Sequence, residues 1–406
     1  MSVLAQNNFQ WPHRRFERWK YTDLKSYFGH VNFEAVHSGG PAQAVNISPE
    51  NAISVIFING QLANRDYESM LPAGLSITPL SEILGTAPER VAAYRKAHAI
   101  DDTLHPMVGI NESLAKEGLW IECDKAVVLK HPIHIIYQAE HDSFGFHNLN
   151  HCIQMAESSK LSVIESVQSG DNRQLFNTVT SVSIGKGASL QHISLSMPDT
   201  QANHIAGLHL WQGQDSKSYS FNVSCGASLA RYDTHAQLQS VGATAEFDGV
   251  SILSGSRHVD HHSIAEHQAD HTVSREYYKM IADDKAHGVF NGKAIVNAGT
   301  HGVDVHQLSR NLLLSSKAAI DTKPELEIYS DDLKANHGAT VGQLDANELF
   351  YLQSRGFSKQ QAQAILTRAF LADVLLKVPD PSIKEWLEGL VADAMDVHFA
   401  SHQGVQ

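Results

Sequence analysis

Alternating apolar and polar positions dominate the middle of the chain. Between residues 118 and 341 the segments are short, rich in Ser, Val, Ile, Thr and His, and punctuated by glycine. In Ser218–Ser224, Tyr219, Phe221 and Val223 alternate with small polar residues, so we expect these three side chains on one face of a strand. Short strands with little helix between them predict a mainly β fold: a sandwich, a barrel or a β-solenoid. No strict repeat period decides among the three.

The region before these strands has a mixed pattern. Phe16–Phe28 can form a short helix, and Ser54–Gly60 has the pattern of a buried strand that enters a turn. Ser81–Leu84 and Pro88–His98 have helical patterns, with a proline at the start of the second. These patterns predict a small, largely helical cap on the β region.

The last sixty residues predict three helices. Capping-box spacing marks the three expected starts, at Asp345 with Glu348, Ser358 with Gln361, and Ser382 with Glu385. Apolar stripes follow on the second and third helices, at Ala362, Ile365, Leu366, Ala369 and Phe370 and at Ile383, Trp386, Leu387, Leu390 and Val391. The stripes predict a helical hairpin that buries its own apolar face, a surface that docks a partner, or both. Three domains are therefore expected: a mixed helical domain (1–105), a β core (106–343) and a helical domain (344–406).

Charge and cysteine content exclude several functions. The net charge is −13 and no Lys/Arg-rich run occurs, which argues against a nucleic-acid or anionic-lipid surface. Cys123, Cys152 and Cys225 have no C-x-x-C spacing, which argues against disulfides and against a four-thiolate metal site within the chain. We expect a cytoplasmic protein, because the first residues lack a signal-peptide pattern and no membrane-length apolar run follows.

One histidine-rich stretch is a candidate metal site. His258–His271 carries five histidines together with Asp260, Glu266 and Asp270, and imidazole with carboxylate suits zinc, iron or nickel. The spacing matches no known metal motif, and the chain has 25 histidines overall. The favoured interpretation is either a structural ladder of imidazoles stacked between successive turns of a solenoid or a solvated face.

Other candidate chemistry has weaker support. Asp331 and Asp332 are adjacent on a strand and should point to opposite faces, so a turn or interface role is favoured over an acid/base pair. No G-x-S-x-G elbow and no G-x-x-x-x-G-K-[ST] loop occurs, so neither serine hydrolysis nor ATP hydrolysis is expected. Asn291-Gly292 is expected to form a tight turn between strands.

Several segments together resemble one family. Thr322–Gly342 combines Lys-Pro, a strand-like LEIYS, two aspartates, a lone histidine and a small-residue GATVG, and a helical pattern follows it. This run resembles the signature of the SufD family, scaffold subunits of the SUF (SufBCD) iron–sulfur cluster assembly system. Further matches in the same order lie at Phe16–Leu24, Gly118–Gln138, Ser274–Val296 and His306–Asp332. The resemblance implies a right-handed parallel β-helix for the core.

The resemblance also implies partners. A SufD-like chain would pair with SufB through the β-helix and hold the SufC ATPase through its carboxy-terminal helices, as a non-catalytic scaffold. Leu349–Phe357 resembles the family's first tail helix, which makes Phe350, Tyr351 and Arg355 the candidate SufC contacts, since aromatic and arginine side chains dominate many interfaces. Flavin binding by the assembled complex and a homodimer of the isolated chain stay open at this point.

His337 is the candidate ligand for an iron–sulfur cluster. In SufD-like proteins the histidine of this motif lies at the SufB interface and is implicated, with a SufB cysteine, in binding the nascent cluster; a neutral imidazole is a competent iron ligand. Here ANHGAT is expected to form a loop, and Ala335 stands where the family often has cysteine, so this chain supplies half a site at most. The alternative is a purely structural histidine at a strand end.

Two other functions remain alternatives. A β-helical polysaccharide lyase or hydrolase would share the fold, but such enzymes are commonly secreted. A SufB-like paralogue would share the family, but the scarcity of cysteine and the lack of an amino-terminal C-x-x-C favour a SufD-like chain.

Overall fold

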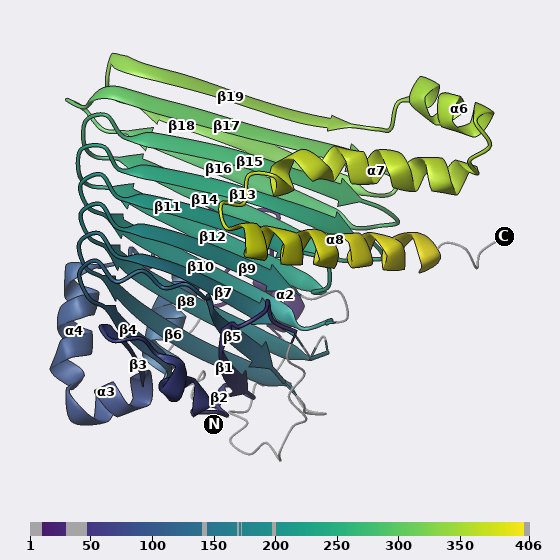
Figure 1. Cartoon of the computed structure of the whole chain (residues 1–406). Coiled ribbons are helices and arrows are strands. Elements are labelled where there is room, and N and C mark those ends of the chain that lie inside the picture. Colours follow the sequence, from purple (N-terminus) through teal and green to yellow (C-terminus); the bar gives the residue numbers. More distant parts are fainter. Residues whose placement is uncertain are drawn as a thin grey trace.

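Two long sheets form the body of the molecule (Figure 1). The computed structural model describes residues 10–29, 47–139, 144–168, 170–171, 173–196 and 200–401. The nine-stranded sheet contains, in spatial order, β18 (Ala319–Ile328), β16 (His287–Val296), β14 (His258–His267), β12 (Leu229–Leu238), β10 (Asn203–Gln212), β8 (Gln174–Ile184), β6 (Gly145–Met155), β4 (Glu117–Cys123) and β3 (Leu75–Pro79). The ten-stranded sheet contains β19 (Asp332–Gly342), β17 (His301–Leu313), β15 (Val273–Ala282), β13 (Thr244–Leu253), β11 (Lys217–Ser224), β9 (Ser189–Ser196), β7 (Lys160–Val167), β5 (Ile133–Gln138), β1 (Ile53–Ile58) and β2 (Gln61–Leu62).

The chain winds between these sheets as a parallel β-solenoid. From β4 onward, successive strands alternate between the sheets, and each pairs in parallel with the strand two places along the chain. Among the strands of the described ranges, only β1 with β2 and β3 with β4 pair antiparallel. This confirms the predicted parallel β-helix and excludes the antiparallel sandwich and barrel.

The turns of the solenoid differ in length. Ala230 is the lateral partner of His204, whereas Ala319 is the lateral partner of His287, so one turn advances the chain by 26 residues and another by 32. The sequence therefore has no strict repeat period, although the fold is repetitive.

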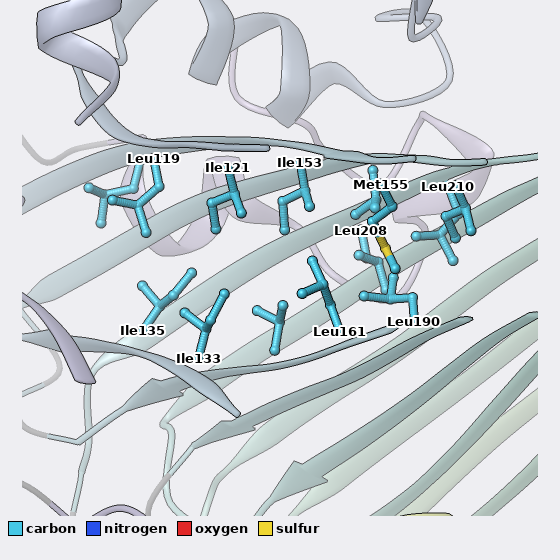
Figure 2. Close-up of a cluster of buried hydrophobic side chains, with 14 of the residues drawn as sticks. Leu119, Ile121, Ile133, Ile135, Ile153, Met155, Leu161, Leu190, Leu208 and Leu210 are labelled. Atoms are coloured by element: carbon cyan, nitrogen blue, oxygen red, sulfur yellow. The ribbon is translucent and has the colours of Figure 1, made fainter. Parts of the chain in front are cut away.

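Apolar side chains fill the interior of the first turns. Figure 2 shows Leu119, Ile121, Ile153, Met155, Leu208 and Leu210 of the nine-stranded sheet facing Ile133, Ile135, Leu161 and Leu190 of the ten-stranded sheet. All ten are at most 5 % exposed. Removing apolar surface from water in this way is the main favourable term for the fold.

A series of aromatic and imidazole rings continues through the interior. Tyr137, His204, Tyr232, His261 and Tyr278 are in successive ring contact, with centroid separations of 6.2, 5.9, 5.2 and 5.0 Å. All five side chains are buried. The interior of the later turns is therefore polar as well as aromatic, which requires its buried groups to find hydrogen-bond partners.

The expected face of Ser218–Ser224 exists, and it points out of the solenoid. Tyr219, Phe221 and Val223 cluster with the carboxy-terminal helices α7 (Lys359–Leu375) and α8 (Pro381–Ser401). The small polar side chains of the same strand are also buried, and Asn222 Nδ2 donates to Tyr278 Oη at 3.4 Å. The outer face of this sheet is thus a second apolar core, covered by two helices (Figure 1).

The predicted hairpin, in which the helices bury their apolar stripes against each other, is therefore wrong in its packing partner. The α8 stripe is buried as expected at Ile383, Leu387 and Val391, but it packs on the ten-stranded sheet. On α7 the buried side chains are Ala362, Thr367, Leu371, Val374 and Leu375, whereas Ile365 and Ala369 of the predicted stripe are exposed.

Helix starts follow the predicted caps in two of three cases. Asp345 caps α6 (Ala346–Ser354), and Ser358 forms a full capping box with Gln361 at α7. The predicted box at Ser382 is wrong, because Asp380 Oδ1 accepts the backbone N–H of Ser382 at 2.9 Å instead. The expected turn at Asn291-Gly292 is also wrong, since both residues lie within β16.

Shorter elements cover the first turns and the outer face of the nine-stranded sheet. They are η1 (Glu17–Trp19), α2 (Leu24–Phe28), η2 (Asp66–Met70), α3 (Leu80–Thr86), α4 (Pro88–Ala97) and α5 (Pro106–Leu114). The helices predicted at Ser81–Leu84 and Pro88–His98 and the strand at Ser54–Gly60 are confirmed as α3, α4 and β1. The helix predicted over Phe16–Phe28 is replaced by η1 and α2. Because β1 pairs with β5, the first hundred residues are joined to the solenoid through its sheet.

Candidate functional site

The last turn of the solenoid is open. β18 and β19 are the edge strands of the two sheets, and every one of their residues is exposed or half-buried, whereas β17 still alternates between buried and exposed positions. Figure 1 shows β19 at the far end of the stack from β1. Edge strands present unpaired N–H and C=O groups, which makes this end a template for pairing with another chain.

The inner face of this open turn is mostly apolar. Register places Ile320, Thr322, Pro324, Leu326 and Ile328 of β18 and Leu333, Ala335, His337, Ala339 and Val341 of β19 beside the inward residues of the preceding turn. Ile328 and Val341 are 41 % and 42 % exposed. Among these ten residues, His337 is the only one with a side-chain nitrogen or sulfur that can ligate iron.

His337 lies within strand β19, not in the predicted loop. Its imidazole is exposed, and its lateral partner is Gln307 of β17, which in turn is partnered by Glu276 of β15. Gln307 and Glu276 are buried, and burial raises the pKa of Glu276 to about 8, so this carboxyl group is largely protonated at neutral pH. Ser263 Oγ lies 3.0 Å from Glu276 Oε2. The exposed imidazole is thus backed by uncharged polar groups inside the solenoid.

The cysteines of this chain lie elsewhere. Cys123, Cys152 and Cys225 are all buried, and none of them lies on β18 or β19. Burial raises the pKa of Cys152 and of Cys225 to about 12, so neither is a thiolate at neutral pH. None of the three cysteines therefore lies beside His337 as a thiolate ligand.

Helix α6 presents the exposed aromatic residues of the carboxy-terminal region. Phe350 and Tyr351 are 72 % and 57 % exposed, and α6 buries no residue of its own. Arg355 Cζ lies 5.2 Å from the centre of the Tyr351 ring, so these two side chains share a face as their spacing predicted. Gly356, with φ of 96°, separates α6 from α7 in a conformation that favours glycine.

The histidine-rich stretch makes ring contacts across turns. The rings of His258 and His287 are 4.9 Å apart, and His261 lies between Tyr232 and Tyr278. Burial lowers the pKa of His261 to about 4, so it is neutral at physiological pH. These contacts support the structural ladder. The turn role favoured for the aspartates also has support, because Asp332 Oδ2 accepts the backbone N–H of Gly302 at 3.2 Å.

Comparison with known families decides the identity. Residues 136–370 match the SufBD core domain of the SUF system of FeS cluster assembly, and residues 3–135 match the SufBD protein N-terminal region. The chain belongs to the SufBD family. This confirms the resemblance read from the motifs, and it makes the chain an iron–sulfur cluster assembly protein.

Three relatives match nearly the whole SufBD chain. The iron–sulfur cluster assembly protein SufD of Escherichia coli is 28 % identical over 92 % of this chain and 87 % of its own length. The SufBD family protein slr0076 of Synechocystis is 30 % identical over 94 % of this chain and 87 % of its own length. Protein ABCI7, chloroplastic, of Arabidopsis thaliana is 24 % identical over 92 % of this chain and 81 % of its own length.

Membrane insertion through a helix finds no support in the described residues. None of their helices combines the length and the apolar character that crossing a bilayer requires.

Proposed function

We propose that this chain is a non-catalytic, SufD-type scaffold subunit that pairs with SufB at its open turn and holds the SufC ATPase through its carboxy-terminal helices. The observation that carries the proposal is the open turn: an apolar inner face and two edge strands surround a single exposed imidazole, His337. Such an end is completed by another solenoid that continues the sheets. We place the assembled complex in the cytoplasm.

His337 would contribute one ligand to a cluster built at this contact. Imidazole can bind iron, and the three thiols of this chain are buried and lie outside β18 and β19, so the sulfur ligands would come from SufB. ATP-driven closure of the SufC pair would then strain the contact and open the enclosed site. The cluster is cargo in this scheme, and flavin binding to the complex has no assigned residues here.

Co-expression tests the partnership. The chain, tagged and co-expressed with SufB and SufC, should recover both proteins together in a pull-down read by mass spectrometry. Recovery of the chain alone, or only as a homodimer, would contradict the proposed complex. A polysaccharide-acting enzyme, the alternative outside this family, would instead bind oligosaccharide, which isothermal titration would detect.

The first prediction separates the role of His337 from folding. His337→Ala removes an exposed imidazole and little buried apolar surface, so the free energy of unfolding should change by less than about 1 kcal/mol. The iron and sulfide content of the co-expressed complex should nevertheless fall severalfold. Metal analysis of the purified complex measures the content, and a melting curve of the variant measures its stability.

A neighbouring histidine provides the control for His337→Ala. His306 of β17 is also exposed, but its lateral partner is Asn336, which places it on the outer face of the same sheet. His306→Ala should leave both stability and cluster content unchanged. A full cluster complement in His337→Ala would reduce His337 to a structural residue.

The second prediction concerns SufC docking by α6. Phe350→Ala combined with Tyr351→Ala removes two exposed aromatic rings, and interface aromatic residues are often worth about 2 kcal/mol or more each. The dissociation constant for SufC, measured by isothermal titration, should rise more than about tenfold. Melting should be unaffected, since neither ring is buried.

Point substitutions suit this test better than truncation. Removing all residues after Asp345 would also uncover Phe221 and Val223 under α7 and α8, so lost binding could reflect misfolding. Leu376→Ala is the matched control, because Leu376 is an equally exposed apolar residue (64 %) at the end of α7. Equal loss of SufC binding in the control, or no loss in the double variant, would contradict docking through α6.

A further inference from the structure

Three imidazoles converge where helix α5 meets the outer face of the nine-stranded sheet. His209 of β10 and His235 of β12 are lateral partners on adjacent strands, so both point to the same face. His105, the residue before α5, lies against them. One nitrogen of each ring lies within 4.8 Å of the others, and the described residues contain no other such group of three His, Cys, Asp or Glu side chains.

The separations suit a small metal ion. His105 Nε2 and His235 Nδ1 are 3.4 Å apart. A tetrahedral ion with metal–nitrogen bonds of about 2.0–2.1 Å holds its nitrogen ligands roughly 3.3–3.4 Å from one another. The ring centres of His105 and His209 are 4.7 Å apart with an interplanar angle of 87°, and the ligand nitrogen of His209 lies within 4.8 Å of the other two.

The cluster contains buried nitrogens that the protein leaves without a hydrogen bond. His105 and His209 are 3 % and 2 % exposed, and His209 Nε2 has no hydrogen-bond partner. His105 Nδ1 and His235 Nε2 also have no hydrogen-bond partner. Buried polar atoms nearly always have one, so unpartnered nitrogens on three adjoining imidazoles are what a site without its ligand would show. A ladder of imidazoles alone would leave these nitrogens unsatisfied.

The surroundings resemble the outer sphere of a histidine metal site. Glu266 Oε2 lies 3.6 Å from His235 Nε2, on the side of the ring away from His105; this is an ion-pair distance and is too long for a hydrogen bond. Carboxylates on that side of a ring commonly orient a ligating histidine once they accept its N–H. Asp233 is also nearby, but Arg231 and Arg18 pair with it. Glu266 is therefore the carboxylate beside the cluster that no arginine pairs with among these contacts.

A small cavity of about 10 Å³ lies on one side of the cluster. His105, Gly207 and Asp233 line it together with mostly apolar residues, whereas His209 and His235 do not, so a metal ion would lie between the three rings and not in this cavity. A methyl group at Gly207 would lie 3.2 Å from His209 Nε2, so glycine keeps this approach clear.

We propose that His105, His209 and His235 bind one divalent first-row transition-metal ion. Three neutral imidazoles suit Zn²⁺ and Fe²⁺, with a fourth position for water. The ion would tie the segment before α5 to two successive turns of the solenoid. This site lies in the middle turns, away from His337, and it does not depend on the proposed cluster function.

Cobalt titration of the full-length chain tests the site. After treatment with a chelator, Co²⁺ should bind at one ion per chain, with the strong visible absorption of cobalt in a low-coordinate nitrogen site. Zn²⁺ should displace it and raise the melting temperature. His209→Phe keeps a ring in place but removes the nitrogen, and it should abolish both the absorption and the thermal shift.

Two further variants keep the test decisive. Glu266→Gln changes a residue outside the cluster and should weaken Co²⁺ binding by about 10–100-fold without altering the stability of the metal-free chain. His301→Ala removes a histidine that is 61 % exposed on β17 and should leave one strong site. The proposal would be overturned if the unaltered chain did not bind Co²⁺ at one ion per chain. It would also be overturned if Glu266→Gln and a folded His209→Phe both bound Co²⁺ as tightly as the unaltered chain.

Discussion

Lowering the pH from 7 to about 5 is expected to unfold the chain. His134, His151, His204, His261 and His267 are all buried, and burial lowers the pKa of His134 to about 3 and of each of the other four to about 4. Histidine in an unfolded chain has a pKa of about 6.5. There is therefore a pH range in which these five imidazoles are neutral in the folded state but protonated in the unfolded chain.

The sign of the effect follows from proton binding. Between pH 6.5 and about 4 the unfolded chain binds protons at these positions and the folded chain does not. The free energy of unfolding therefore has its full value above pH 6.5 and decreases as the pH falls through this range. Each histidine removes about 2 kcal/mol at pH 5, and the five together remove about 10 kcal/mol. That loss is comparable with the whole stability of an ordinary domain, about 5–15 kcal/mol.

Two buried carboxyl groups oppose this loss. Burial raises the pKa of Glu276 to about 8 and of Asp248 to about 6, so both stabilise the folded state as the pH falls. Between pH 7 and pH 5 they return about 4 kcal/mol, which is less than the histidines remove. The net loss between pH 7 and pH 5 is therefore about 6 kcal/mol, which lies within the range of a whole domain's stability, so we expect an acid transition near pH 5.

Chemical denaturation at pH 7 and pH 5.5 measures the effect directly. His204→Phe removes one buried titrating group, so its loss of stability between the two pH values should be smaller by about 1 kcal/mol, whatever its absolute stability. His301→Ala, an exposed histidine, should show the same loss as the unaltered chain. A chain that remains folded at pH 4.5, or a pH dependence unchanged in His204→Phe, would contradict the role of the imidazoles.

Local sequence signals predicted the ends of the chain and the strand character of its middle. The caps at Asp345 and Ser358 act through backbone N–H groups within three residues, so spacing alone locates them. The solenoid itself followed from the family resemblance, because turns of 26 and 32 residues conceal the period. Alternation in Ser218–Ser224 predicted that the strand has two different faces, but not which face points into the solenoid. Both faces are buried, and the apolar one is buried only because α7 and α8 cover it from outside.

The site was only partly visible in the sequence. His337 was found through its motif, whereas the open apolar face around it depends on which strand ends the stack. The three-histidine cluster had no local signal, because His105 and His235 are 130 residues apart in sequence and meet only through strand register and the position of α5. The histidine-rich stretch on β14 has the composition of a metal site, but strand register brings the rings of His258 and His261 into contact with rings of neighbouring turns.

Replacing Arg231 by methionine is expected to cost about 3–5 kcal/mol of unfolding free energy. Arg231 is fully buried on the outer face of β12, and its guanidinium donates to Asp233 at 2.7 Å and to Asp260 at 2.6 Å. Burial alone would raise the pKa of Asp233, but the charges of Arg231 and Arg18 hold it well below its usual range. Without Arg231, two buried carboxylates lose most of their compensation.

The same side chain fastens the amino-terminal segment to the solenoid. Arg231 Nη1 donates to the backbone carbonyl of Arg18 at 2.8 Å, and the guanidinium lies 3.8 Å from the centre of the Trp19 ring. Thr22 adds a hydrogen bond to Asp260. We therefore expect Arg231→Met to loosen η1 and α2 as well as to lower stability, which hydrogen exchange of residues 17–28 would reveal.

Two comparisons isolate the cause in denaturant titrations of Arg231→Met. Adding Asp233→Asn and Asp260→Asn neutralises the stranded carboxylates, so the triple variant should regain much of the lost stability. Arg368→Met removes a half-exposed arginine on α7 that pairs with Asp396 of α8, and it should lower the free energy of unfolding by less than about 1 kcal/mol. If Arg231→Met cost no more than Arg368→Met, the buried network would not be what holds the amino-terminal segment in place. Recovery in the triple variant, with residues 17–28 protected again, would instead show that unpaired charge, and not lost packing on Trp19, is the main penalty.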